Sequence, residues 1–192
     1  MKLSFTVFAC ALLLLLSPLH SNAQGFGKPK EPTTLKAGVS YVWLSEYDSQ
    51  GLMFYNDFHH YVGGKVAVGM NIAALNASRY DESMKIFTIK NTFYMASMHA
   101  TVDLMQNQTL AMRLGAGPTV RHRAEINSDA EGEGTIDGSV MHIRTSDVGG
   151  FGYLENDFFI FKNGVAGGRV AYHHYTKGTA VFSLGFHVGF SF

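Results

Sequence analysis

Apolar and polar residues alternate along the last fourteen residues of the chain, 179–192. Every even position from Ala180 onward is apolar, and the odd positions are small or polar except for Val181. Successive side chains of a strand point to opposite sides, so this period of two predicts a β-strand with one apolar face. The last four members of that apolar face are Phe186, Val188, Phe190 and Phe192.

Seven earlier segments have a similar period and predict seven more strands. The clearest is 109–123, where Leu110 and Leu114 share one face and Arg113 and Arg121 share the other. The facing of the second and sixth strands stays open, because aromatic residues occur on both of their faces. The predicted strands are 35–45, 53–62, 66–74, 86–105, 109–123, one within 140–161, 165–175 and 179–192.

Short and long connections alternate between these strands. Tight turns are predicted at 63–65, at 106–108 and at 162–164, where Asn163-Gly164 is a pair favoured in hairpins. The other connections are longer and more polar, including 77–85 and the acid-rich stretch 124–138, except for the short one at 176–178. Eight strands joined in this way predict an all-β fold, an eight-stranded antiparallel up-and-down transmembrane β-barrel over residues 35–192.

The amino terminus predicts export. A charged Lys2, an apolar run from Phe5 to Leu16 and small residues before Gln24 are typical of a secretory signal peptide, here residues 1–23. A lipoprotein anchor at Cys10 is the alternative, but the apolar run continues past that cysteine. Cleavage removes the one cysteine of the chain, so no disulfide or thiolate site is expected in the remainder. Residues 24–34 are expected to form a short periplasmic lead-in.

Composition agrees with strands but does not select a barrel. The chain has 21 Gly, 15 Phe and 9 Tyr against 4 Pro, and equal numbers of acidic and basic residues. This charge balance gives no reason to expect nucleic acid as a partner. A soluble β-sandwich with its apolar faces packed together is the alternative fold, although it does not account for the carboxy-terminal pattern ending at Phe192. In a membrane the sheet must close, since an unpaired backbone amide in hydrocarbon costs about 2–7 kcal/mol.

The inward faces of the predicted barrel carry charged residues. Eight strands leave an interior that side chains fill, so a wide pore is not expected. Five of these residues lie near the short turns and are predicted to form a salt-bridged plug: Asp103, Arg113, Glu155, Asp157 and Arg169. The full predicted network of interior polar residues is Asp103, Arg113, Arg121, Glu155, Asp157, Arg169 and His187.

Together, the signal peptide, the eight alternating segments and the Phe192 ending resemble the small OmpA/OmpX-like outer-membrane β-barrel family, with its opacity-protein and PorT-like relatives. The Leu114-Gly115-Ala116-Gly117-Pro118 run adds to this resemblance. The resemblance implies location in the bacterial outer membrane, contact with its lipid and lipopolysaccharide, and insertion by the barrel assembly machinery. The last strand, with Phe186, Val188, Phe190 and Phe192, would be the assembly signal.

The resemblance does not fix one task, so three functions are considered. The first is a structural or surface-interaction role with a non-conducting lumen and an external protein as partner. The second is binding or passage of a small apolar ligand. The third is a lipid-modifying enzyme, prompted by His173-His174-Tyr175-Thr176, but no serine follows at the spacing of lipid A deacylases and no G-x-S-x-G elbow is present. No catalytic residue is therefore predicted.

No metal site or cofactor is predicted either. Neighbouring histidines on a strand point to opposite faces, so neither His59-His60 nor His173-His174 can chelate one ion as a pair. His59 and His187 are expected near the periplasmic end and His173 near the outer end, which disperses the inward histidines. The acidic residues of 124–138 lack EF-hand spacing and are expected to be a solvated loop.

Overall fold

The computed structural model describes residues 33–45, 49–82, 85–107, 109–127, 141–161 and 163–192. The predicted signal peptide, most of the predicted lead-in and the acidic residues of 129–137 lie outside the described residues. No helix in the described ranges is long and apolar enough to cross a membrane. The strands are β1 (Thr33–Leu44), β2 (Gln50–Gly63), β3 (Val66–Asp81), β4 (Ile86–Gln106), β5 (Leu110–Asn127), β6 (Met141–Ile160), β7 (Gly164–Tyr175) and β8 (Val181–Ser191).

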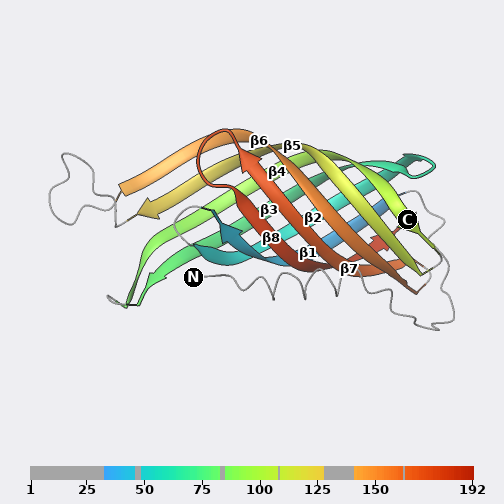
Figure 1. Cartoon of the computed structure of the whole chain (residues 1–192), viewed down its shortest axis with the longest axis horizontal. Helices are drawn as coiled ribbons and strands as arrows, with labels where there is room; N and C mark the ends of the chain where they lie inside the picture. Colours follow the sequence, from blue (N-terminus) through green and yellow to red (C-terminus); the bar gives the residue numbers. More distant parts are fainter. Residues whose placement is uncertain (1–32, 46–48, 83–84, 108, 128–140, 162) are drawn as a thin grey trace.

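Each strand pairs antiparallel with the next one in the chain, and β8 pairs with β1 to close the barrel (Figure 1). The closing seam runs from Thr34 opposite Ser191 to Leu44 opposite Val181. Closure leaves no strand with an unpaired edge, which is the requirement for a sheet surrounded by hydrocarbon. The predicted eight-stranded antiparallel up-and-down barrel is confirmed. The three short turns, Thr33 and Phe192 lie at one end of the barrel, here named the turn end; the opposite end is the loop end.

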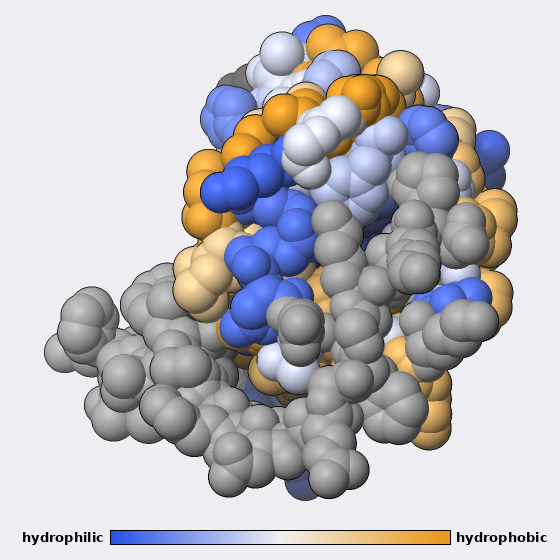
Figure 2. Space-filling model, turned by 90° about the vertical axis from the view of Figure 1, so that its right-hand side faces the viewer, coloured by the Kyte–Doolittle hydropathy of each residue, from blue (hydrophilic) through white to orange (hydrophobic). Residues whose placement is uncertain are grey.

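Side chains sort by the period of two. Phe186 and Met98 on the outside are 75% and 69% exposed, whereas Lys36 and Glu155 on the inside are fully buried. Figure 2 looks onto the turn end and shows apolar residues along both flanks with hydrophilic residues between them. The facing that the sequence left open is settled by the closed register: β2 turns Asp57 inward, and β6 turns Phe151 and Tyr153 inward.

The interior differs between the two halves of the barrel. The turn-end half contains charged residues, while the loop-end half contains a buried apolar cluster around Leu75, Phe93 and Met95. The simple rule of apolar outside and polar inside therefore fails in the loop-end half. The cluster comprises Val42, Leu44, Met53, Tyr55, Ala73, Leu75, Ala77, Phe93, Met95, Tyr175 and Val181.

Several predicted boundaries were wrong. β3 continues to Asp81 through part of the predicted loop 77–85, and β5 continues to Asn127 into the predicted loop 124–138. These polar extensions keep their ladder partners, for example Ser78 opposite Lys90, so backbone pairing continues beyond the apolar pattern. Thr33 and Thr34 belong to β1 rather than to the lead-in, because they pair with β2 and β8.

The hairpin between β6 and β7 forms at the predicted place, with Ile160 opposite Gly164. Gly164, the last residue of the predicted turn, already starts β7, and Phe161 takes the left-handed conformation with φ of 56°. Between β2 and β3, the turn at 63–65 forms as predicted, with φ of 53° at Gly64, where the missing side chain makes this conformation inexpensive.

Candidate functional site

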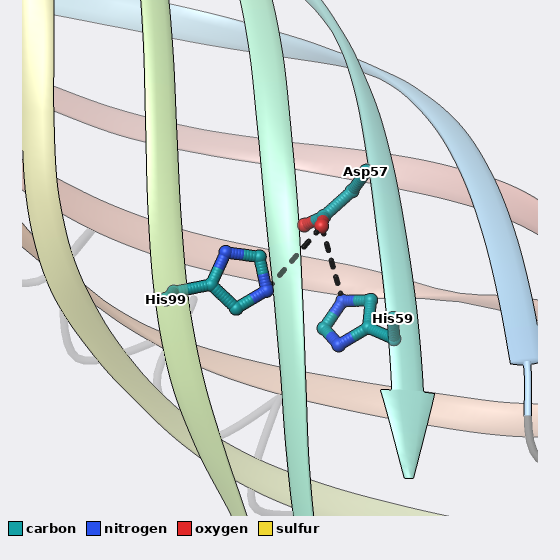
Figure 3. Close-up of side chains that lie close together, drawn as sticks. All are labelled: Asp57, His59 and His99. Atoms are coloured by element: carbon teal, nitrogen blue, oxygen red, sulfur yellow. Dashed lines mark ion pairs between the residues drawn. The ribbon is translucent and has the colours of Figure 1, made fainter.

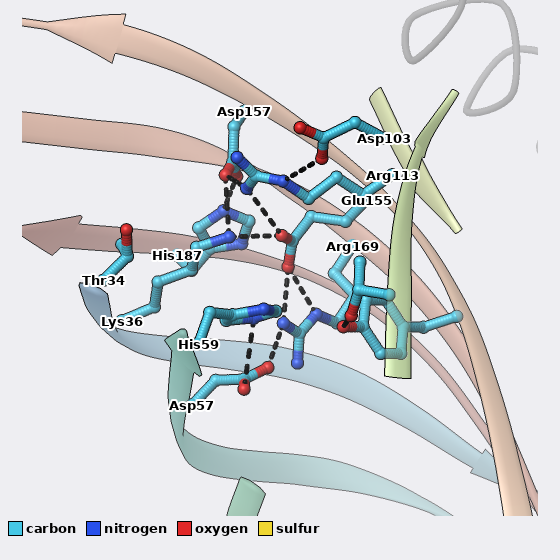
Figure 4. Close-up of polar contacts among 12 residues, drawn as sticks. Thr34, Lys36, Asp57, His59, Asp103, Arg113, Glu155, Asp157, Arg169 and His187 are labelled. Carbon is cyan, nitrogen blue, oxygen red and sulfur yellow. Dashed lines mark hydrogen bonds and ion pairs between the residues drawn. The ribbon is translucent and has the colours of Figure 1, made fainter. Parts of the chain in front are cut away.

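Buried charged residues from seven strands meet inside the turn-end half of the barrel (Figure 4). Their positions follow from strand geometry, since each lies on the inward row of its strand. No more than 5% of any of these residues is exposed. This interior network is made of Lys36 on β1, Asp57 on β2, Asp103 on β4, Arg113 on β5, Glu155 and Asp157 on β6, Arg169 on β7 and His187 on β8.

Four of these residues form a row of alternating charge across neighbouring strands. Asp103 lies opposite Arg113, Arg113 opposite Glu155, and Glu155 opposite Arg169. Within the row, Arg113 Nε donates to Asp103 Oδ1 at 2.9 Å, and Arg169 Nε donates to Glu155 Oε2 at 2.8 Å. Opposite charges on facing strand positions contribute roughly 0.2–1 kcal/mol per pair. The row therefore favours one register for β4 to β7.

Other contacts cross the interior between strands that are not neighbours. Lys36 on β1 reaches β6, where its Nζ donates to Asp157 Oδ2 at 2.7 Å and also contacts Glu155. Asp157 Oδ1 also lies 2.6 Å from His187 Nε2 on β8, while its pairing with Arg113 joins the neighbouring strands β5 and β6. Such contacts fill the cross-section of the barrel instead of lining its wall.

Arg169 lies between two tyrosine rings. Its guanidinium carbon is 4.8 Å from the centroid of Tyr55 and 4.4 Å from that of Tyr153, and its Nη2 pairs with both Glu155 and Asp57. Desolvating an ion costs several kcal/mol, which is offset here by two carboxylates and two aromatic faces. Removal of either carboxylate would leave a buried charge with fewer partners.

The structure brings together six of the seven predicted network residues, and Arg121 lies apart. Arg121 is eight residues beyond Arg113 on β5, or about 27 Å along the strand. At the loop end it donates to Asp147 Oδ2 and to the backbone carbonyls of Lys177 and Thr179, at 2.7–2.9 Å. Its guanidinium carbon lies 3.8 Å from the ring centroid of Tyr175.

The sequence did not assign Lys36 and Asp57 to the network. Their partners come from β6 and β7, at the far side of the interior, and only the closed register reveals such contacts. The sequence signal for Asp57 and His59 was their spacing of two residues, which puts both on one face of β2.

The inward histidines are less dispersed than predicted. His59 on β2 and His99 on β4 lie together, with ring centroids 4.9 Å apart. Two groups have donor atoms close enough to hold a metal ion: Asp57, His59 and His99 in one, and Glu155, Asp157 and His187 in the other.

The remaining residues singled out in the sequence lie as their strand positions require. His173 is buried and its ring stacks on Phe151 at 5.1 Å, while His174 is exposed on the opposite face of β7. The candidate assembly residues all lie on the outside of the barrel, at the carboxy-terminal part of the chain: Phe186, Val188, Phe190 and Phe192.

Comparisons with known proteins identify the class by fold. No protein-family model matches the chain, and no curated protein matches it. Neisserial surface protein A (NspA) has a TM-score of 0.64 at 11% identity, over 84% of this chain and 97% of that protein. OprG from Pseudomonas aeruginosa has a TM-score of 0.54 at 9% identity, over 87% of this chain and 99% of that protein. Ail, the attachment invasion locus protein of Yersinia pestis, has a TM-score of 0.52 at 13% identity, over 83% of this chain and 96% of that protein. The chain therefore has the fold of the small eight-stranded outer-membrane β-barrels.

Proposed function

We propose that this protein is an integral barrel of the bacterial outer membrane with a structural or surface-interaction role and a non-conducting interior. Its location is supported by the apolar outer face, which includes Phe54, Met70, Met98, Phe186 and Val188. In water such a face would be an exposed patch far larger than soluble monomers carry. In a bilayer the same face would contact hydrocarbon.

One observation carries the non-conducting interior: the charged side chains contact one another across the barrel. Lys36 from β1 meets Asp157 from β6, and Arg169 from β7 meets Asp57 from β2. An aqueous channel would need a continuous hydrated path between such residues, yet they are buried against one another. Beyond this layer, the apolar cluster around Leu75 and Phe93 and the buried Arg121–Asp147 pair occupy the loop-end half.

Recordings in planar bilayers test this proposal. We expect the purified protein to insert without producing a steady open-channel level, because the interior network and the apolar cluster close the lumen in series. A general porin inserted under the same conditions provides the positive control. A reproducible steady conductance from the purified protein, at one level per inserted molecule, would contradict the proposal.

The proposed location in the outer membrane also has consequences for assembly and for surface contacts. The outward aromatic residues Phe186 and Phe190 of β8, with Phe192 directly after it, would be recognised by the barrel assembly machinery before the seam with β1 closes. The loop end would face outward, toward lipopolysaccharide and an external protein partner. This orientation is supported by the long β3, β4, β5 and β6 strands, which extend beyond their neighbours at that end (Figure 1).

A further inference from the structure

Asp57, His59 and His99 converge on one point inside the barrel (Figure 3). Asp57 Oδ1 lies 3.2 Å from His59 Nε2 and 3.5 Å from His99 Nε2. The other carboxylate oxygen of Asp57 pairs with Arg169, which fixes the carboxylate in place. The three side chains are nearly completely buried, so their relative positions are set by packing.

A glycine between the two histidines makes this convergence feasible. Gly69 on β3 lies opposite His59 on one side and opposite His99 on the other. A Cβ atom at Gly69 would come within 2.5 Å of His99 Nε2. The missing side chain therefore leaves the space in which the two rings meet.

The histidine nitrogens have no hydrogen-bond partner among the described residues. This holds for Nδ1 and Nε2 of both His59 and His99, although both residues are at least nine-tenths buried. Each Nε2 has only the contact with Asp57 Oδ1, and neither Nδ1 has a polar contact among the described residues. Buried polar atoms are normally satisfied, so this group requires an explanation. His187 shows the contrast, because its Nε2 contacts Asp157 and its Nδ1 contacts the Tyr55 hydroxyl.

The two distances from Asp57 Oδ1 to the histidine nitrogens fit a tetrahedral metal site, and all three donor atoms lie within 4.8 Å of one another. Ligand bonds of about 2.0–2.1 Å in tetrahedral geometry place neighbouring donor atoms roughly 3.3 Å apart. The two distances from Asp57 Oδ1, 3.2 Å and 3.5 Å, bracket that value. Two imidazoles and one carboxylate favour zinc or a similar borderline divalent ion over calcium or magnesium, which prefer all-oxygen sites.

We propose that Asp57, His59 and His99 bind one divalent transition-metal ion, with zinc as the best-fitting ion. Nε2 of each histidine and Oδ1 of Asp57 would be the protein ligands, and the fourth position would take a water molecule. The second group, Glu155, Asp157 and His187, is not a comparable site, because Lys36 and Arg113 already occupy its carboxylates.

The charge of the interior network supports this assignment. The network contains four carboxylates and three permanent cations, so it lacks one positive charge when its histidines are neutral. A divalent ion beside Asp57 would supply positive charge where the carboxylate and the two imidazole rings are already in place. The cations are Lys36, Arg113 and Arg169, and the carboxylates are Asp57, Asp103, Glu155 and Asp157.

To test this proposal, the tag-free full chain is folded in detergent in the presence of zinc or of cobalt, because a buried site takes up its ion during folding. After removal of free metal, we expect about one ion per chain, and the visible spectrum of tetrahedral cobalt. His59→Gln and His99→Gln should each reduce the retained metal at least about tenfold, consistent with the loss of a ligand or its support. Folding of each variant is checked by heat-dependent gel mobility.

His187→Gln is the matched control, since it removes another buried interior histidine and should retain the metal. Wild-type protein that folds with zinc yet retains none would overturn the proposal, and a histidine proton would then supply the missing charge. Retention by folded His99→Gln with loss by folded His187→Gln would also overturn it and move the site to the second group. If neither ligand variant folds, the cobalt spectrum of the wild type decides between these outcomes.

Discussion

Two tyrosines reach Arg169 because glycines lie beneath their rings. Tyr55 crosses Gly38 on β1, and Tyr153 crosses Gly115 on β5; a Cβ at either glycine would come within 2.3 Å of the ring. An aromatic ring that covers a strand glycine is a recurrent stabilising device in twisted sheets. Here it also builds the aromatic walls around the Arg169 guanidinium.

Gly115→Ala should therefore destabilise the barrel. The new methyl group would push Tyr153 away from Arg169, and overpacking of this kind costs roughly 1–3 kcal/mol. The midpoint of denaturant unfolding, followed by fluorescence of the single tryptophan Trp43, measures the effect. Gly152→Ala is the control, because its Cβ would meet its nearest atom at 3.7 Å. Equal midpoints for the two variants would show that the Tyr153 contact is unimportant.

The predictions for single residues were correct where the alternation within one strand is enough to tell which side chains point into the barrel. Asp103 and Arg113 were placed inside correctly and do pair with each other. The meeting of Asp57, His59 and His99 was missed, because it depends on two strand registers and on the gap at Gly69. No single strand carries that information, since the two histidines are 40 positions apart.

At the scale of elements, Arg121 connects β5 to the segment between β7 and β8. Its guanidinium donates to the carbonyls of Lys177 and Thr179, and the same group donates to Asp147 on β6. Hydrogen bonds from a charged donor contribute about 1.5–3 kcal/mol each. A side chain that the sequence assigned to the interior polar network thus holds a segment at the loop end, away from the other members of that network.

Loss of this contact should loosen the β7–β8 segment. We expect Arg121→Met to raise the rate of tryptic cleavage after Lys177 at least about tenfold, as expected for loss of one or two charged hydrogen bonds. Mass spectrometry of the fragments locates the cut. Arg144→Met, which replaces an exposed arginine of β6, is the control and should leave cleavage after Lys177 unchanged. An unchanged rate in folded Arg121→Met would show that Arg121 does not hold the segment.

The sequence predicted the number, order and direction of the strands, but not all their ends. The number follows from alternation, which lipid imposes only across the hydrocarbon. Outside that layer β3 and β5 continue by backbone pairing, with Ser78 opposite Lys90 and Glu125 opposite Asn91. The side chains of these extensions do not alternate between apolar and polar, so the sequence could not show that the strands end at Asp81 and Asn127.

At the scale of the whole molecule, the barrel has an apolar exterior and an interior with two parts: a charged turn-end half, and a loop-end half that holds an apolar cluster together with the buried pairs Arg121–Asp147 and Arg123–Glu125. Closure makes both halves depend on one another, since each strand contributes to the wall around them. The apolar cluster of the loop-end half, with Leu75, Phe93 and Met95, was not predicted. Inward apolar residues on these strands look no different in sequence from outward ones, until the ladder fixes which row faces inside.

The central claim is that one row of each strand faces hydrocarbon and the other faces the barrel interior. Single tryptophans introduced in a Trp43→Phe background, in bilayers with bromine atoms at mid-chain, test it most directly. Phe186→Trp and Met98→Trp should be quenched several-fold more strongly than Phe93→Trp and Phe151→Trp, because the first two positions are exposed and the others buried. Strong quenching at 93 and 151, or none at 186 and 98, would contradict the account.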